Sequence, residues 1–163
     1  MARARCPRPR ILSCKLEPTR MAAGPPLDHP CYAATFIRQL IGEHAREQFV
    51  ALYVSSAHCP IAYDTFTMGG INAVVSDPGA VLRGAVMSGA PFIITAHNHP
   101  SGDARPSRPD QQTWVLITES ARSLGLEVLD HMVLGADHYF SASEGGLREY
   151  DCAQLPAEFR RSA

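Results

Sequence analysis

Apolar residues recur at regular spacing from residue 31 onward, and their period changes along the chain. After Cys31 they follow a helical period, which predicts an amphipathic helix over residues 32–46. A short run of β-prone apolar residues predicts a strand over 49–54, and residues 61–66 are suited to be its hairpin partner. The first part of the chain is therefore expected to fold as a helix followed by two strands.

The middle of the chain combines a helix signal with a fully apolar segment. Asp77 followed by Pro78 is typical of an N-cap and a first-turn proline, and Gly89 is suited to end the helix that they begin. Residues 91–96 (PFIITA) are almost entirely apolar without alternation, as expected for a strand covered on both faces. We therefore expect this segment to lie inside a sheet.

The remaining elements complete an α/β order. A polar, proline-rich loop leads to a predicted helix over about 107–124, capped by Gly125. Apolar strands are predicted over 127–134 and 138–141. This order predicts the α/β class and a three-layer α/β/α architecture with one mixed β-sheet, in a single domain over residues 31–150.

The composition fits one domain without a membrane span. The 163 residues are 45% hydrophobic, which is enough for one core, and no apolar run approaches the roughly 20 residues of a membrane-spanning helix. The cysteines are odd in number and form no C-x-x-C pair, and no signal-peptide core follows the basic start. These features predict free thiols in a cytoplasmic protein. The five cysteines are Cys6, Cys14, Cys31, Cys59 and Cys152.

The chain begins with a basic segment rich in proline and arginine. Residues 1–20 carry six Lys or Arg and one Glu, a charge of +5, so the rest of the chain carries −6 of the formal net charge of −1. Residues 1–30 are predicted to be a disordered tail, and residues 151–163 a second tail. Alternatively, translation starts at Met21, or the segment is an organellar transit peptide. A basic tail would make a weak DNA contact, whereas the acidic body would repel a phosphate backbone.

Two histidines stand at the exit of the segment 91–96. Residues i and i+2 of an extended chain project to the same side, so His97 and His99 can converge on one zinc ion at about 2.0–2.1 Å. Asp110 follows a loop that is long enough to return its carboxylate to the same point. Three protein ligands leave the fourth position to water, as in catalytic zinc sites, where the pKa of that water falls to about 7.

Such a site needs a base, and each residue also has a plainer interpretation. Glu47 precedes the strand over 49–54 and could be the base if that strand lies beside the one that leads to His97, but alone it is a solvated residue at a helix end. Ser107 and Asp110 have the spacing of a capping box. An H-x-H pair alone is weak evidence for a metal. Histidines without mutual spacing are interpreted as ordinary surface or core residues: His29, His44, His58, His131 and His138.

The loop as a whole is more specific than any of these pairs. Its sequence HNHPSGDARPSRPD resembles the metal-binding signature of the JAB/MPN (JAMM) metalloprotease superfamily. Within that superfamily it looks like the RadC branch, whose hallmark is H-x-H-P-S-G-x-x-x-P-S-x-x-D. The likeness covers about residues 45–148 and implies the cytidine-deaminase-like JAB/MPN architecture. Further similar segments are Glu47-Gln48-Phe49, Asp77-Pro78, Leu129-Asp130-His131, Ser141 and residues 144–147.

The chain departs from longer RadC proteins in two places. Those proteins carry an N-terminal helical region with a helix-hairpin-helix element, for which residues 1–44 are too few. The turn over residues 55–60 (SSAHCP) also differs from the usual polar turn, at the edge of the hairpin and away from the site.

The resemblance implies a role for each residue of the motif. His97, His99 and Asp110 would bind one zinc ion, and Glu47 would hold and deprotonate the water in the fourth position. Ser107 would hydrogen-bond the developing oxyanion or steady the water. The implied reaction is hydrolysis of a peptide or isopeptide amide bond in a protein or peptide substrate whose identity the sequence does not supply.

Two other functions remain open at this point. RadC-type proteins carry a DNA-repair label, so the domain could be a binding module that the basic tail anchors to DNA. A scaffold of that kind would not need the intact ligand set. A metal-dependent nuclease would use the same water against phosphate, but the acidic body of the chain disfavours a nucleic-acid substrate.

Overall fold

The computed structural model describes residues 26–41, 46–67 and 77–150, which form one sheet and three helices. Most of the predicted N-terminal tail and all of the predicted C-terminal tail lie outside these residues. The first described residues already pack against the domain. Leu27 is buried, and its N–H donates to the carbonyl oxygen of His58 at 2.8 Å.

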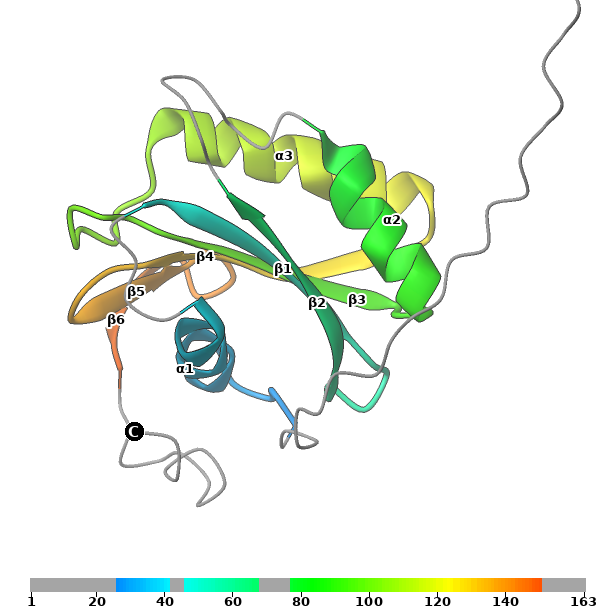
Figure 1. Cartoon of the computed structure of the whole chain (residues 1–163), viewed down its shortest axis with the longest axis horizontal. Helices are drawn as coiled ribbons and strands as arrows, with labels where there is room; N and C mark the ends of the chain where they lie inside the picture. The colour runs from blue at the N-terminus through cyan, green and yellow to red at the C-terminus, as the bar shows by residue number, and fades with distance from the viewer. Residues whose placement is uncertain (1–25, 42–45, 68–76, 151–163) are drawn as a thin grey trace, which may run out of the picture.

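A six-stranded sheet forms the middle of the molecule (Figure 1). In spatial order its strands are β2 (Pro60–Thr67), β1 (Gln48–Val54), β3 (Phe92–Asn98), β4 (Glu127–Leu134), β5 (His138–Ser141) and β6 (Gly146–Glu149). Among these strands β3 and β4 are the one parallel pair, and the other neighbours run antiparallel. β3 lies inside the sheet between β1 and β4, as its unbroken apolar sequence predicts.

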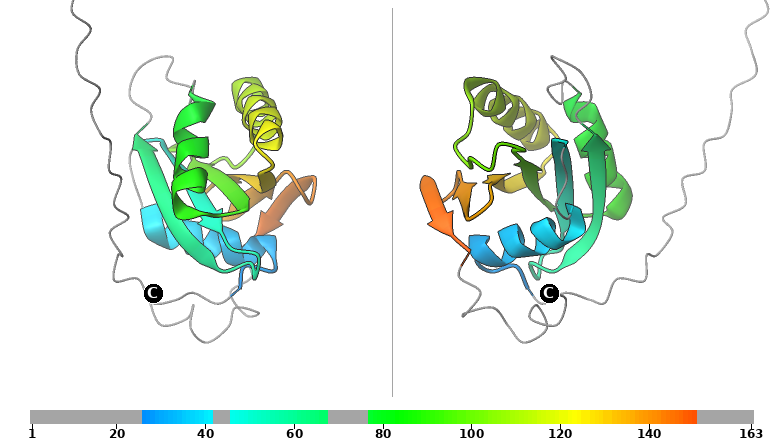
Figure 2. Two further views of the ribbon diagram at one scale, coloured as in Figure 1. Left: turned by 90° about the vertical axis from the view of Figure 1, so that its right-hand side faces the viewer. Right: turned by 60° about the vertical axis from the view of Figure 1, so that its left-hand side comes forward.

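Helices cover both faces of this sheet. α1 (Pro30–Ile41) lies against one face, and α2 (Pro78–Ser88) and α3 (Arg108–Ser123) lie against the other (Figure 1, Figure 2). The connection from β3 to the parallel β4 passes through α3, because parallel neighbours need a crossover. The predicted three-layer α/β/α architecture with one mixed sheet is confirmed.

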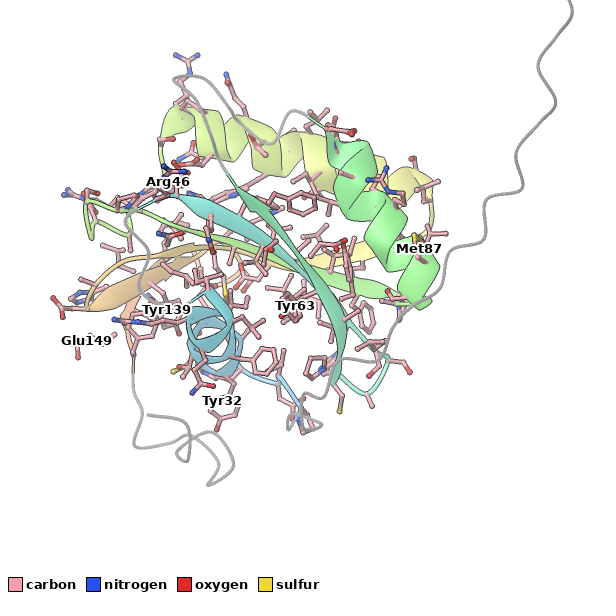
Figure 3. The ribbon with its side chains drawn as sticks, viewed as in Figure 1. Tyr32, Arg46, Tyr63, Met87, Tyr139 and Glu149 are labelled. Atoms are coloured by element: carbon pink, nitrogen blue, oxygen red, sulfur yellow. The ribbon has the colours of Figure 1, made fainter. Side chains whose placement is uncertain are left out.

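The buried strand β1 contributes to the core on each side of the sheet. Its side chains alternate, so Val50 and Leu52 pack on the α1 side, and Ala51 and Tyr53 pack on the side of α2 and α3. Tyr139 of β5 joins the core on the α1 side, where Figure 3 shows it beside that helix. A strand covered on both faces needs apolar side chains at successive positions, which explains the apolar run of β1.

α2 approaches β1 and β2 closely. Its N-cap Asp77 accepts a first-turn N–H, and Gly89 ends it in the left-handed region with φ 68°, as predicted. A Cβ on Gly84 would lie 2.0 Å from Oη of Tyr53, which itself donates to Oδ2 of Asp64 at 2.9 Å. Glycine at this position therefore permits the contact between the helix and the sheet.

The observed elements differ from the predicted ones in two places. The described part of α1 ends at Ile41, residues 42–45 lie outside the described part of the chain, and Arg46, at the end of the predicted helix, is not helical. The helix prediction was wrong at Arg46, because its carbonyl oxygen turns toward β3 and accepts a side-chain hydrogen bond there at 3.2 Å. β6 was not predicted, since its four residues include one apolar side chain and show no alternation.

Candidate metal centre

β3 delivers the first histidine of the motif in a fixed orientation. His97 is the next-to-last residue of the strand, and 2% of its surface is exposed. Its ring stacks on Phe49, its partner in β1, with 6.5 Å between ring centroids and 11° between the planes. The burial and the stacking leave the ring little freedom, so the position of its Nε2 is set by the strand pair.

His99 follows the strand and is held by two backbone groups. Its N–H donates to the carbonyl of Leu134 at 3.1 Å, which continues the pairing of β3 with β4 by one residue. Its ring Nδ1 lies 2.7 Å from the carbonyl oxygen of Asp103. A carbonyl only accepts, so Nδ1 carries the proton and the neutral ring presents an unprotonated Nε2. That Nε2 lies 3.0 Å from Nε2 of His97.

Asp110 enters the centre from the first turn of α3. The predicted capping box is present: Ser107 Oγ accepts from the N–H of Asp110, and Oδ2 of Asp110 accepts from the N–H and from the hydroxyl of Ser107, each at 2.6 Å. The same carboxylate places Oδ1 3.4 Å from Nε2 of His97 and Oδ2 3.6 Å from Nε2 of His99. Asp110 is therefore both the N3 member of the capping box and a predicted metal ligand.

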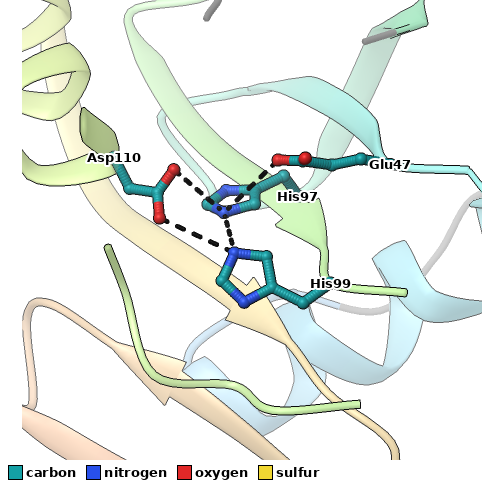
Figure 4. A group of neighbouring side chains, drawn as sticks. All are labelled: Glu47, His97, His99 and Asp110. Carbon is teal, nitrogen blue, oxygen red and sulfur yellow. Dashed lines mark hydrogen bonds and ion pairs between the residues drawn. The ribbon is translucent and has the colours of Figure 1, made fainter. Parts of the chain in front are cut away.

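Glu47 immediately precedes β1, the strand that pairs with β3 beside His97. Its Oε1 lies 4.0 Å from Nε2 of His97, and one third (33%) of its side-chain surface is exposed. Figure 4 shows the four side chains converging, and one ligand atom from each lies within 4.8 Å of all the others. β1 lies beside β3, which is the condition under which Glu47 was expected to reach the site, and this pairing brings Glu47 to His97 across 50 residues of sequence.

The spacing of these atoms fits a zinc ion. Ligands at the ordinary zinc distances of about 2.0–2.2 Å are separated by about 3.2–3.6 Å in a tetrahedral site. Nε2 of His97 and Nε2 of His99 lie 3.0 Å apart, Oδ1 of Asp110 lies 3.4 Å from the first and Oδ2 lies 3.6 Å from the second, and Glu47 lies farther out, at 4.0 Å from His97. The nitrogen and oxygen donors suit zinc, and the described residues contain this one cluster of ligand-type side chains. The cluster could hold a metal ion.

The electrostatics of the cluster favour a charged carboxylate. Burial alone raises the pKa of Asp110, but the hydrogen bonds from His97, His99 and Ser107 outweigh burial and hold this pKa far below its usual range. The pKa of His99 is raised, chiefly by its contact with Asp110. A divalent cation would replace the proton that the two histidines and Asp110 would otherwise share, so metal binding should release protons.

A buried histidine lies behind the cluster, in agreement with its interpretation as an ordinary core residue. The ring of His131 in β4 stacks on Trp114 of α3 at 5.4 Å, and its nitrogens face the hydroxyls of Thr95 and Thr118 at 2.5 and 2.9 Å. Burial lowers its pKa to about 4, with a smaller effect from His97. His131 therefore docks α3, the helix of Asp110, onto the sheet. Spacing along the sequence gave no signal for this contact.

The remaining histidines do not join the cluster. His58 is partly buried and His138 is exposed, with acidic neighbours Asp28 and Glu149 respectively, and His29 accepts a hydrogen bond from the N–H of Cys31. His44 lies outside the described residues. For the three described histidines, the interpretation as ordinary residues agrees with their positions.

No helix within the described ranges is both long and apolar enough to span a membrane.

Comparisons with known proteins point to one family. The family model for the RadC-like JAB domain matches residues 27–147. Similar curated proteins are the UPF0758 protein of Staphylococcus carnosus, 35% identical over 72% of this chain and 52% of the relative, and that of Carboxydothermus hydrogenoformans, 37% identical over 65% and 47%. The UPF0758 protein of Methanosarcina acetivorans is 31% identical over 80% of this chain and 55% of its own length. The chain spans about half the length of the curated relatives it matches.

Proposed function

The chain belongs to the family of RadC-like JAB domains, and on this premise we propose that it is a zinc-dependent hydrolase of the JAMM type that cleaves a peptide or isopeptide amide bond. The observation that carries the proposal is the convergence of two histidines and two carboxylates within 4.8 Å. The two histidine nitrogens approach each other and the Asp110 carboxylate to 3.0–3.6 Å, and the Glu47 carboxylate stands slightly apart at 4.0 Å from His97.

His97, His99 and Asp110 would hold the ion, and Glu47 would serve the reaction. When bound, zinc supplies a Lewis acid that polarises the substrate carbonyl and lowers the pKa of water. The charged state of Asp110 supports this division of roles, and so does the hydrogen bond at Nδ1 of His99, which leaves Nε2 of the neutral ring available to a metal.

Glu47 has the position of a general base. Its carboxylate is partly exposed, so it can reach water and substrate, and its Oε1 lies 4.0 Å from the nearest proposed ligand atom. It would take one proton from water as the water oxygen bonds to the carbonyl carbon. It would then give a proton to the amine nitrogen as the C–N bond breaks.

Ser107 has two roles in this proposal. Its hydroxyl donates to Oδ2 of Asp110 at 2.6 Å and thereby orients a ligand, in the manner of the outer partners of other metal sites. Its other role, a hydrogen bond to the developing oxyanion, follows from the resemblance and requires the hydroxyl to turn away from Asp110.

The natural substrate is expected to be a protein or peptide, and the location cytoplasmic. A DNA-binding module would depend on the basic residues 1–20, which lie outside the described part of the chain, and a nuclease would have to bind its substrate through the acidic remainder. The observed cluster is what a hydrolase needs and is dispensable for a scaffold, so amide hydrolysis is the function we propose.

The test combines metal analysis with hydrolysis. Protein purified without added metal is analysed by mass spectrometry for bound metal, and its hydrolysis of a mixture of fluorogenic peptides and ε-lysyl isopeptides is measured before and after chelation. We expect one zinc per chain and an activity that chelation removes and zinc restores. A chain with no bound zinc, or with activity indifferent to chelation, would contradict the proposal.

A further inference from the structure

Asn98 lies between the two histidines, and its side chain does not point into the metal cluster. Its Oδ1 accepts the N–H of Gln48 at 2.8 Å, and its Nδ2 donates to the carbonyl oxygen of Arg46 at 3.2 Å. These two backbone groups belong to the residues on either side of Glu47. Figure 3 shows Arg46 at the start of β1, beside the loop that follows β3.

The two hydrogen bonds fix the backbone of Glu47 from both sides. The Arg46 carbonyl belongs to the peptide unit before the Cα of Glu47, and the Gln48 N–H belongs to the unit after it. Each peptide unit is planar, so fixing both units fixes φ and ψ of Glu47 and the direction of its Cα–Cβ bond. One amide side chain therefore sets the origin and direction of the Glu47 side chain.

The position of Asn98 in the sheet makes this effect local. Backbone pairing between β1 and β3 runs from Val54 and Phe92 to Phe49 and His97, and it stops there. Beyond this last backbone pair, the Asn98 side chain connects β3 to Gln48, the first residue of β1, which follows Glu47. A fixed backbone limits the Glu47 carboxylate to the positions that its staggered side-chain rotamers reach from one origin and direction.

We infer that Asn98 is a positioning residue for Glu47: its amide holds the two flanking peptide units so that the carboxylate faces the ion held by His97, His99 and Asp110. This inference rests on the proposed function, because Glu47 needs a fixed position only if it serves a reaction at that ion. Asn98 itself touches neither the cluster nor the substrate. It acts through the backbone of Glu47.

The closing experiment follows the Gln48 amide and the Glu47 carboxylate by NMR. In Asn98→Leu, which keeps the size of the side chain but removes both hydrogen bonds, the Gln48 N–H should exchange with solvent about three- to tenfold faster than in the wild type. Asn98→Asp keeps an acceptor and should restore the protection of Gln48 but not the contact with Arg46. Gln112→Leu, which removes an amide from an exposed position on α3, should leave this exchange rate unchanged.

The probe of function is zinc alone. In the wild type, zinc should shift the side-chain carboxyl carbon of Glu47 and the ring signals of both histidines. In Asn98→Leu the histidine shifts should remain and the Glu47 shift should fall by at least about half, which a general loss of stability would not produce. An unchanged Gln48 exchange rate, or an unchanged Glu47 shift, would overturn the inference.

Failure of the proposed function gives a different result. If the wild type binds no zinc, the proposal of a zinc hydrolase fails, and the Asn98 inference fails with it, whatever the Gln48 exchange rate. If the wild type binds zinc and hydrolyses peptides while Asn98→Leu retains both the Gln48 protection and the Glu47 shift, only the inference about Asn98 fails. Should Asn98→Leu not fold, Asn98→Ser provides the same comparison with a smaller change in polarity.

Discussion

Oδ2 of Asp110 accepts two hydrogen bonds from Ser107, while Oδ1 of the same carboxylate lies 3.4 Å from Nε2 of His97. The start of α3 and the metal centre are thus built on one side chain. The helix N-terminus favours a negative charge at this position, and so does a divalent cation. Helix capping and metal binding therefore select the same ionised state of Asp110.

The first prediction concerns the metal ligands. His97→Ala and His99→Ala each remove one of three proposed protein ligands, so each variant should lose zinc binding at micromolar metal. His138→Ala, at an exposed position on β5, is the matched control and should bind zinc as the wild type does. Titration with a zinc-sensitive dye measures all three affinities. Full zinc affinity in either ligand variant would show the ligand assignment to be wrong.

The second prediction separates the base from the ligands. Glu47→Gln keeps the shape of the side chain but cannot accept the proton, so zinc content should stay the same while kcat falls by roughly 10²–10⁴-fold. Zinc analysis and peptide hydrolysis on the same sample provide the measurement. Loss of zinc from this variant would make Glu47 a ligand, and an undiminished kcat would transfer the role of base to another carboxylate.

The third prediction concerns Ser107. Ser107→Ala removes the N-cap of α3 and should lower the free energy of unfolding by about 0.5–2 kcal/mol. It also removes a hydrogen bond that orients the Asp110 carboxylate, so zinc should bind more weakly, by about 10- to 100-fold. Ser107→Thr should restore both properties, and urea unfolding with and without zinc measures them. Ser107→Asp would place a second carboxylate beside Asp110 and should fail to restore zinc binding.

The fourth prediction is a pH dependence set by His131. The unfolded chain protonates this histidine at its ordinary pKa of 6.5, whereas in the folded protein burial lowers the pKa to about 4. Between these values the unfolded state binds more protons, so the contribution of His131 is complete above pH 6.5 and declines as the pH falls toward 4. The loss should amount to about 3 kcal/mol.

The comparison of wild type with His131→Gln isolates this contribution. Glutamine keeps a polar group between α3 and the sheet but does not titrate, so its unfolding free energy should fall less steeply between pH 6.5 and 4. Urea unfolding of the zinc-free proteins at several pH values gives both curves. Parallel curves would mean that His131 keeps an ordinary pKa in the folded protein.

The fifth prediction concerns the basic N-terminal segment. A chain that begins at Met21 keeps Leu27, which is buried, and all of α1, so it should retain the melting temperature and the zinc content of the full chain. A chain that begins at Tyr32 loses the buried Leu27 and should melt at a lower temperature. Any DNA affinity of the full chain should disappear in the Met21 form and should weaken steeply with salt. DNA binding that persists in the Met21 form would favour the nuclease.

Local sequence patterns predicted most of the fold. The apolar run over 91–96, the Asp77-Pro78 pair and the capping box at Ser107 each depend on neighbours in the chain, and the structure shows β3, α2 and α3 at these places. The end of α1 and the strand β6 were not predicted. Arg46, which was predicted to be helical, contacts Asn98 of β3 instead, and β6 is a short exposed edge strand with little apolar signal.

The candidate site divides in the same way. Histidines two residues apart and a serine three residues before an aspartate form a local motif, so the sequence revealed them directly. Two other contacts join residues that are far apart in sequence. His131 contacts Thr95 and Trp114, and Asn98 contacts the backbone beside Glu47. A single sequence shows no pattern for such contacts, because they arise only when β1, β4 and α3 assemble around β3.

The segment from the end of β3 to the first turn of α3 carries all of the proposed zinc ligands, and the proposed base lies elsewhere in the chain. The three proposed ligands all lie within residues 97–110, whereas Glu47 enters from the start of β1. In evolutionary terms, the proposed zinc ligands and the proposed base for amide hydrolysis are inherited on different segments. Under the proposed function, a lineage that exchanged Glu47 for a neutral residue would keep the proposed zinc ligands and lose the proposed base. In this architecture, one substitution at Glu47 would be enough to convert the proposed enzyme into a metal-binding domain without hydrolytic activity.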